Sequence, residues 1–147
     1  MTLKTNQYNL RTKRYTLSDM HKILEDQNKF SFLISLRDIY SDHGNIGLVI
    51  LQKINKKTLF IDTFLMSCRV IGRYLESFMF NYIREYASKN KYDNIMGEFI
   101  NTKKNIVAKD LFETHGFNKE SNNTKKNIIK YSCITKKIKK IKLEIYE

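Results

Sequence analysis

The sequence predicts a mixed α/β domain in which an antiparallel meander is followed by a parallel pair of strands around a long helix. Short apolar, β-branched runs follow one another between residues 30 and 66, with polar turn residues between them, which favours antiparallel strands. A helical pattern of apolar residues then extends over residues 71–87. A further strand after this helix completes a strand–helix–strand unit, whose two strands run parallel in one sheet.

Length and composition favour one domain over residues 1–147. A chain of 147 residues with 41% hydrophobic residues can bury a continuous core without disulfides or metals. The polar residues 1–14 could be the remnant of a linker, and the tail of residues 136–147 could add an edge strand. The sequence has no apolar run long enough to span a membrane and no secretory signal, so we expect a cytoplasmic protein without membrane contact.

The first predicted elements are a helix and a hairpin. Thr16 and Asp19 have the spacing of a capping box, which predicts a helix from Thr16 to about Gln27. Phe30–Arg37 and Gly47–Ile54 are apolar runs separated by polar residues, and we expect them to form an antiparallel hairpin.

The later elements carry the strand–helix–strand unit. Thr58–Met66 is predicted to be the third strand of the meander, and the helix that follows must pack one broad apolar face on the sheet. Ile95–Ile100 is then the parallel strand, Asn105–His115 a short helix and Asn127–Ile134 a late strand.

The net charge of +12 suits an anionic cofactor, an acidic protein partner or nucleic acid. An alternative is a codon bias toward A and T, because lysine, asparagine and isoleucine are abundant while proline and tryptophan are absent. Much of the excess charge lies in residues 125–142, where lysines are more often solvated than bound. We therefore expect nucleic acid not to be the partner.

Neither cysteine has the spacing of a metal ligand. Cys68 and Cys133 form no CxxC or paired Cys/His motif, so we expect no metal site and, without secretory features, no disulfide. Cys133 lies in an apolar stretch and is predicted to be a core residue. His43 and His115 lie in turn-like segments, where we expect exposed side chains.

The junction between the third strand and the long helix predicts binding of an anion. The first amides of a helix have no partner within it, and the helix dipole adds positive charge, so such a junction attracts phosphate oxygens. Arg69 and Arg73 add formal charge, and Gly72 lets a ligand approach the backbone. The alternative is an ordinary glycine turn with solvated arginines.

These residues resemble a known pattern. The order Arg-x-x-Gly-x-(Gly/Ala) between a strand and a long helix, followed by a strand, an Asn-led helix and Gly-Phe, is similar to the GNAT acyltransferase superfamily. More narrowly, the segment from Ile61 to Arg73, with Glu76 after it, resembles the carboxy-terminal GNAT-like domain of the FkbH-like, HAD-IIIC family. Further similar positions are Asn6-Gln7-Tyr8-Asn9, Asp38 with Gly44, Thr102-Lys103-Lys104-Asn105 and Gly116-Phe117.

The resemblance implies a GNAT fold with a phosphopantetheine groove where the third strand and the parallel strand splay apart. Backbone groups of Phe64, Leu65 and Met66 would pair with the pantetheine amides, and Asn105 would reach the pantetheine arm. The donor would be coenzyme A or a carrier-bound phosphopantetheine, bound without a metal. Its pyrophosphate would lie on the turn formed by Arg69, Val70, Ile71, Gly72, Arg73 and Tyr74.

The sequence departs from the family pattern at two positions. Tyr74 stands where the pattern has glycine or alanine, and its ring could obstruct the pyrophosphate. Phe112 aligns with the tyrosine that protonates the leaving thiolate in many GNAT enzymes, so that acid is absent. FkbH-like proteins pass a glyceryl group through an enzyme thioester to an acyl carrier protein; their phosphatase-like half is missing here, because no DxDx(T/V) motif occurs.

Cys68 is the candidate nucleophile. A thiol beside Arg69 and at a helix start is expected to have a lowered pKa, and its thiolate could accept an acyl group. The alternative is a half-buried cysteine packed under the turn. Asp62 could be a general base or only a hydrogen-bond acceptor, and Glu98 could point into the groove.

Two functions compete. One is an acyltransferase-like domain that binds an acyl thioester and transfers its acyl group. The other is a non-catalytic GNAT-like module that docks an acidic acyl carrier protein or a separate HAD-type phosphatase partner; Tyr74, Phe112 and the basic composition favour it.

Overall fold

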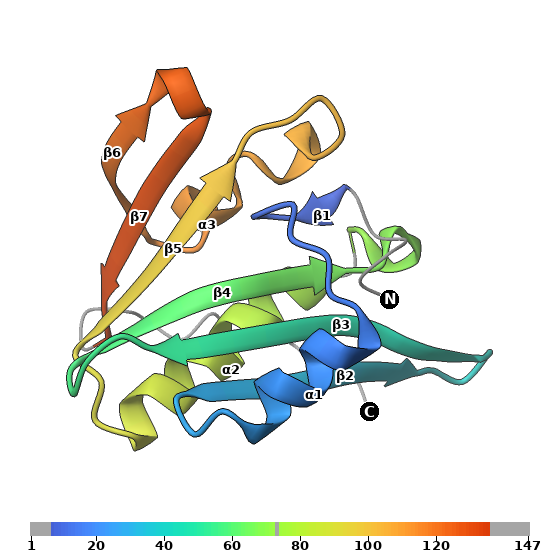
Figure 1. Cartoon of the computed structure of the whole chain (residues 1–147). Helices are drawn as coiled ribbons and strands as arrows, with labels where there is room; N and C mark the ends of the chain where they lie inside the picture. The colour runs from blue at the N-terminus through green and yellow to red at the C-terminus, as the bar shows by residue number, and fades with distance from the viewer. Residues whose placement is uncertain (1–6, 73, 136–147) are drawn as a thin grey trace.

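The computed structural model describes residues 7–72 and 74–135, which form a seven-stranded sheet with helices on both faces (Figure 1). The spatial order of the strands is β2-β3-β4-β5-β7-β6, and the short β1 pairs with β4 outside this order. The strands are β1 (Tyr8–Asn9), β2 (Lys29–Arg37), β3 (Asp42–Lys53), β4 (Thr58–Met66), β5 (Asn94–Ile100), β6 (Asn118–Asn123) and β7 (Ile128–Ile134). The α-helices are α1 (Leu17–Glu25), α2 (Leu75–Lys89) and α3 (Leu111–Thr114).

The predicted fold class is confirmed: β4 and β5 are a parallel pair in an otherwise antiparallel sheet. The third strand has the predicted bounds. In contrast, β3 begins at Asp42, five residues before the expected Gly47. The additional residues pair with the end of β2 across two register shifts, and this irregular part lacks the apolar run that was used to predict the strand.

The two longer helices cover opposite faces of the sheet (Figure 1). The buried face of α2 packs in the main core through Met79, Phe80 and Ile83. On the other face, Ile23 of α1 packs with Leu48, Ile50 and Leu65 in a smaller cluster. This layering buries β4 on both sides, which fits its almost uninterrupted run of buried residues.

The start of α1 follows the sequence prediction. The Thr16 hydroxyl accepts a hydrogen bond from the Asp19 amide at 3.2 Å, and the Asp19 carboxylate accepts one from the Thr16 amide at 2.9 Å, so the capping box is formed. The helix ends at Glu25, two residues before the expected end.

The long helix starts later than its apolar pattern suggests. A 3-10 turn, Cys68–Val70, follows β4, and α2 begins only at Leu75. Gly72 and Tyr74 both have positive φ, +81° and 58°, so the backbone between the two elements cannot continue a helix.

His115 is buried, so the expectation of an exposed side chain was wrong. Its ring stacks on Phe80 at a centroid distance of 4.4 Å, and its Nδ1 lies 2.7 Å from the Leu111 carbonyl oxygen. Burial lowers the pKa of His115, and the neutral ring donates from Nδ1 to Leu111 and accepts at Nε2 from the Ser77 hydroxyl.

The segment after β5 and the last strands also differ in detail from the predictions. The expected helix Asn105–His115 is divided into a 3-10 turn, Ile106–Ala108, and α3. β7 confirms the expected late strand, and Cys133 is buried in it as predicted. β6 was not predicted, because all of its residues are exposed and mostly polar. The expected edge strand at 136–147 lies outside the described residues, among which no helix is long and apolar enough to cross a membrane.

Candidate functional site

The parallel strands β4 and β5 separate after a short paired section. They pair from Thr58 and Asn94 to Ile61 and Gly97, but β4 continues to Met66 and β5 to Ile100 without pairing with each other. The edge of β4 that faces β5 is therefore open to another partner. This divergence is the splayed opening that the sequence analysis expected.

An N-terminal segment, residues 8–13, fills this opening, and we call it the strap (Figure 1). Its first two residues form β1, in which Tyr8 pairs with Met66 and Asn9 with Leu65. The next carbonyl oxygen, that of Leu10, accepts a hydrogen bond from the Ile100 amide of β5 at 2.8 Å. The strap thus contacts both splayed strands.

Residues of the strap belong to the core. Tyr8, Asn9 and Leu10 are buried, with Leu10 only 1% exposed. Residues 1–14 are mostly polar, which had suggested a possible linker remnant. Two buried apolar side chains and the pairing with β4 hold this segment against the sheet.

A charged cluster lies where the strap crosses β4. The Arg11 guanidinium donates to the Asp62 carboxylate at 2.6 Å and to Glu98 at 3.1 Å, and it also stacks over the Phe60 ring. Lys13 donates to the same Asp62 oxygen at 2.8 Å. One strap residue therefore bridges carboxylates from both splayed strands.

Asp62 occupies an irregular position that aims it at this cluster. A register shift between β3 and β4 leaves Asp62 without a direct partner on β3, between the pairs of Thr63 and Ile61. Besides Arg11 and Lys13, its carboxylate accepts hydrogen bonds from Tyr15 at 2.5 Å and from Thr63 at 3.1 Å.

The environment of Asp62 keeps it ionised. Burial opposes ionisation of the carboxyl, but hydrogen bonds from Lys13 and Tyr15 and the nearby cations outweigh it, so the pKa of Asp62 is lowered. A carboxylate with a lowered pKa and four donors is a weak proton acceptor. Its geometry is that of a structural anchor for the strap.

Tyr15 contacts the Asp62 carboxylate, and Glu98 lines a cavity beside it. Burial, together with the hydrogen bond to Asp62, raises the pKa of Tyr15 to about 12. The Glu98 carboxylate accepts a hydrogen bond from Arg11 of the strap. A cavity of about 350 Å³ lies over β4 and β5 here, with walls that include Arg11, Asp62 and Glu98.

The turn after β4 uses several of its own amides. The amides of Val70 and Ile71 donate to the carbonyl oxygens of Ser67 and Cys68 at 3.2 and 3.4 Å, and the Ser67 hydroxyl accepts from the Arg69 amide. Val70 is buried in the core. The amides of residues 69–71, which belong to the predicted pyrophosphate turn, therefore donate to groups of the protein itself. Arg73 lies outside the described residues.

The first amides of α2 receive no capping hydrogen bond from the side chain of the N-cap residue. Tyr74 is its N-cap residue in the left-handed region, and its side chain, 74% exposed, makes no capping hydrogen bond. A Cβ added to Gly72 would meet no atom within 4 Å, so the space above this turn is open. α2 therefore starts at Leu75, after the predicted anion-binding turn.

One strap residue also reaches the start of α2. Burial raises the pKa of Tyr8, and the charge and hydrogen bond of the Glu76 carboxylate raise it further. The strap thus runs from the start of α2 along the edge of β4 to Asp62. This is the path that the resemblance implied for a phosphopantetheine arm.

The remaining candidate residues are separated by the fold. Cys68 is a free, exposed thiol on the 3-10 turn, several residues before α2. Asn105 is fully buried: its Nδ2 donates to the carbonyl oxygens of Asn9 and Ile100 at 2.9 Å, and its Oδ1 accepts from the Thr102 amide and hydroxyl. Phe64 pairs with Val49 of β3.

Phe112 lies in the core, with its ring against Gly97 of β5. It is 1% exposed and stacks on Tyr131 at a centroid distance of 4.9 Å. Its ring covers Gly97, since a Cβ on that glycine would lie 2.4 Å from the ring. This position therefore offers neither a hydroxyl group nor access to a ligand in the opening.

The cluster of Arg11, Lys13 and Tyr15 was not predicted as part of the site. These residues meet Asp62 from a distance of about fifty positions in the sequence, and no local pattern indicates such a contact. Among the residues that the structure describes, no group of histidine, cysteine and carboxylate side chains could hold a metal ion.

Comparison with solved structures identifies the fold. Neither a protein-family model nor a curated protein matches the sequence. A GNAT family acetyltransferase from Elizabethkingia anophelis with acetyl-CoA bound is similar with a TM-score of 0.63 and 12% identity, over 81% of this chain and 83% of that one. An IAA acetyltransferase from Bacillus cereus gives 0.63 and 12% over 81% and 85%.

A spermidine N-acetyltransferase from Vibrio cholerae, in complex with CoA and spermine, is similar with a TM-score of 0.64 and 17% identity, over 84% of this chain and 78% of that one. The chain has the GNAT acetyltransferase fold. In this GNAT fold the splayed strands are β4 and β5, and the strap lies between them. At these identities the similarity concerns the fold alone.

Proposed function

We propose that the chain is an acyltransferase-like domain that binds an acyl thioester through its phosphopantetheine arm, carried by coenzyme A or by an acyl carrier protein. The divergence of β4 and β5 beyond Ile61 and Gly97 is the observation that carries the proposal. A GNAT fold with this divergence offers a strand edge to a ligand that contains amides. The GNAT neighbour from E. anophelis was solved with acetyl-CoA bound.

The strap shows that the opening can hold an extended chain that contains amides. An extended peptide, Tyr8–Asn9, already pairs there with Leu65 and Met66 of β4. A pantetheine arm also has two amides along an extended chain, and it could replace these backbone pairs. The arm and the strap would then compete for one strand edge, and donor binding would displace the strap.

The donor phosphates would lie at the start of α2. The uncapped amides at residues 75–77 and the exposed Arg69 provide donors and positive charge beside the open space above Gly72. The exposed Tyr74 side chain, which makes no capping hydrogen bond, would have to turn aside or stack on the ligand. The side-chain amide of Asn105 would be free to contact the pantetheine arm once its hydrogen bond to the Asn9 carbonyl oxygen is broken.

Cys68 is the proposed acyl acceptor within the protein, because its thiol is free and exposed near the end of β4. Its thiolate would attack the thioester carbonyl carbon, a new carbon–sulfur bond would form, and the donor thiolate would leave and take up a proton. The acyl group would then pass to a second thiol or to another nucleophile by the reverse attack.

Intact-protein mass spectrometry with acetyl-CoA tests this step. We expect a mass increase of one acetyl group that is lost in Cys68→Ser, whereas Cys133→Ser, which changes a buried thiol, should keep it. Calorimetry with CoA measures donor binding independently of transfer. Absence of both CoA binding and acyl transfer, to protein or to added thiols, would contradict the proposal.

A second function is favoured by the occupied opening. A non-catalytic GNAT-like module would keep the strap in place and dock a carrier protein or a separate HAD-type partner on its basic surface. The burial of Phe112 and the anchored strap support it, as does the sequence resemblance to the FkbH-like family. Binding of an acidic carrier protein without CoA binding and without acyl transfer would select this function.

A further inference from the structure

The outer edge of β2 is open. This strand stands at one end of the strand order, and among the residues that the structure describes it pairs only with β3 (Figure 1). The Lys53 amide of β3 donates to the carbonyl oxygen of Asn28, its opposite residue, at 2.8 Å. Hydrogen-bonded pairs alternate along an antiparallel ladder, so the amides and carbonyl groups of Ser31 and Leu33 point away from β3. They form a row of backbone groups to which a further strand can bind.

This edge lacks the features by which proteins usually prevent association of their sheets. Those features are a proline, a β-bulge, a charge in the middle of the strand or a covering segment. The chain has no proline, and the register shifts of β2 occur only after Ile34. Charged side chains stand only at its two ends, Lys29 and Arg37. The part of β2 from Lys29 to Ile34 is therefore regular and open to association.

Apolar side chains border this edge. A groove of about 330 Å³ is lined by Leu24 of α1, by Phe30 and Phe32 of β2 and by Tyr82 of α2. The rings of Phe32 and Tyr82 lie at a centroid distance of 4.6 Å. Leu24, Leu33 and Tyr82 are exposed. A strand that pairs with this edge would therefore bury apolar surface in addition to forming backbone hydrogen bonds.

The backbone groups of the edge are complementary to themselves. When two copies of β2 run antiparallel with Ser31 opposite the partner's Ser31, these two residues exchange amide–carbonyl hydrogen bonds. Leu33 then lies opposite the partner's Lys29, and its amide donates to that carbonyl oxygen, which also points outward. The Lys29 amide needs no new acceptor, because it already donates to the Asp26 carbonyl oxygen at 3.0 Å.

Charge distinguishes this register from its neighbours. With Leu33 opposite the partner's Leu33, Lys29 would lie opposite the partner's Arg37, and like charges directly opposite are destabilising. With Ser31 opposite the partner's Ser31, Arg37 at the end of β2 instead approaches the partner's Glu25, at the end of α1. The basic end of one copy thus meets an acidic position of the other. A second copy of the chain therefore fits this edge.

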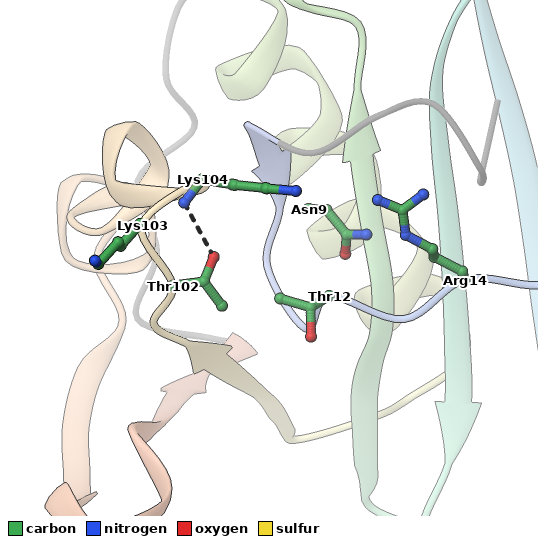
Figure 2. A pocket seen from close by; sticks show the side chains of 6 residues that line it. All are labelled: Asn9, Thr12, Arg14, Thr102, Lys103 and Lys104. Carbon is green, nitrogen blue, oxygen red and sulfur yellow. Dashed lines mark hydrogen bonds between the residues drawn. The ribbon is translucent and has the colours of Figure 1, made fainter.

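We propose that two copies of the chain associate through β2, antiparallel and with Ser31 opposite the partner's Ser31, and so form one continuous sheet. The opening between β4 and β5 takes no part in this contact, because β3 and β4 lie between it and β2. Figure 2 shows Asn9 and Thr12 of the strap beside Lys104 of the loop after β5, on the far side of β4 from β2. The association therefore persists whether or not a donor displaces the strap, and it does not depend on the proposed function.

Sedimentation velocity over a range of protein concentrations tests the proposal. We expect a dimer that becomes tighter as salt is added, because each copy carries a net charge of +12 and salt screens the repulsion. Ser31→Pro removes an amide that points away from β3, so β2 should stay paired with β3 while the dissociation constant of the dimer rises at least about tenfold.

A lysine at the exposed position 33 gives a second test that does not depend on the proline variant. Leu33→Lys should also raise the dissociation constant at least about tenfold, because the new lysine would lie opposite the partner's Lys29. Leu17→Lys, the same change at an exposed leucine of α1, is the matched control and should leave the dimer unchanged.

Cysteine cross-linking tests the register. The background variant is Cys68→Ser, in which the remaining native cysteine, Cys133, is buried. Ser31→Cys should form a disulfide between two copies, because opposing residues of a hydrogen-bonded pair lie about 5.5 Å apart at Cα. Leu33→Cys should not, because it would lie opposite the partner's Lys29.

Several results would overturn the proposal. A monomer at every concentration, at low and at high salt, would show that the edge of β2 binds no second copy. Protection of the Ser31 and Leu33 amides from hydrogen exchange in such a monomer would show that another part of the chain covers the edge. A dimer that Leu33→Lys leaves unchanged would place the contact elsewhere on the molecule. A disulfide formed by Leu33→Cys but not by Ser31→Cys would contradict the register.

Discussion

The side-chain amide of Asn105 donates to the backbone carbonyl oxygen of Asn9 at 2.9 Å, and so ties the N-terminal strap to the loop after β5. The same amide donates to Ile100, at the end of one splayed strand. This buried side chain therefore helps to hold the strap in the opening between β4 and β5, together with the pairing to β4 and the ion pairs of Asp62.

Replacement of Asn105 by alanine should destabilise the protein by about 2–3 kcal/mol, because buried partners lose their hydrogen bonds. Urea denaturation measures this loss, and faster hydrogen exchange at the Ile100 amide should accompany it. Asn90→Ala is the matched control, since the exposed side-chain amide of Asn90 makes one hydrogen bond, to the Tyr86 carbonyl oxygen. Its loss should lower the free energy of unfolding by less than about 1 kcal/mol. Equal effects of the two substitutions would refute the role given to Asn105.

Asp62→Asn should destabilise the protein by about 3 kcal/mol, because Arg11 and Lys13 would lose their buried partner. The pKa of Asp62 is lowered in the folded protein, so its stabilising effect is present above the unfolded value of 3.8 and is lost as the pH falls below it. Urea denaturation between pH 6 and pH 3 should therefore show a smaller loss of stability in Asp62→Asn than in the wild type. An unchanged acid dependence would contradict the lowered pKa.

Tyr15→Phe should flatten the alkaline dependence of stability. The pKa of Tyr15 is about 12 when folded and about 10 when unfolded, so its contribution is complete below pH 10 and is lost as the pH rises toward 12. Thermal unfolding from pH 9 to pH 11.5 should show a gentler decline in the variant. Tyr40→Phe, at an exposed tyrosine, serves as the control and should keep the wild-type slope.

Gly97→Ala should destabilise the protein by about 2 kcal/mol, because the new Cβ would lie 2.4 Å from the Phe112 ring. Adding Phe112→Leu should recover part of this loss, and a double-mutant cycle by urea denaturation measures the coupling. Gly44→Ala meets no atom within 4 Å but has a φ of +63°, so it should cost about 1 kcal/mol and be insensitive to Phe112→Leu. Strict additivity at Gly97 would show that the ring is not the obstacle.

The sequence was informative where structure depends on neighbours along the chain. The capping box of Thr16 and Asp19 and the apolar run of Thr58–Met66 are local signals, and both elements were predicted at their starts. The order of strands and helices then implied the parallel pair, because such a crossover has few solutions.

The strap could not be predicted, because its stability comes from distant contacts. β1 has only two residues, and its partner on β4 is more than fifty positions away. In the sequence, nothing distinguishes Arg11 from the other cations of the polar residues 1–14, yet in the structure it bridges Asp62 and Glu98. The resemblance indicated where a ligand would lie, but not that the chain itself already lies there.

Hydrogen exchange of the strap, followed by mass spectrometry with and without saturating CoA, measures whether donor and strap share the edge of β4. We expect faster exchange in residues 8–13 when CoA is bound, with protection kept at residues 64–66, because the pantetheine amides would replace the strap there. Bound CoA with unchanged or slower exchange in the strap, or no binding of CoA at any concentration, would contradict a donor site between β4 and β5.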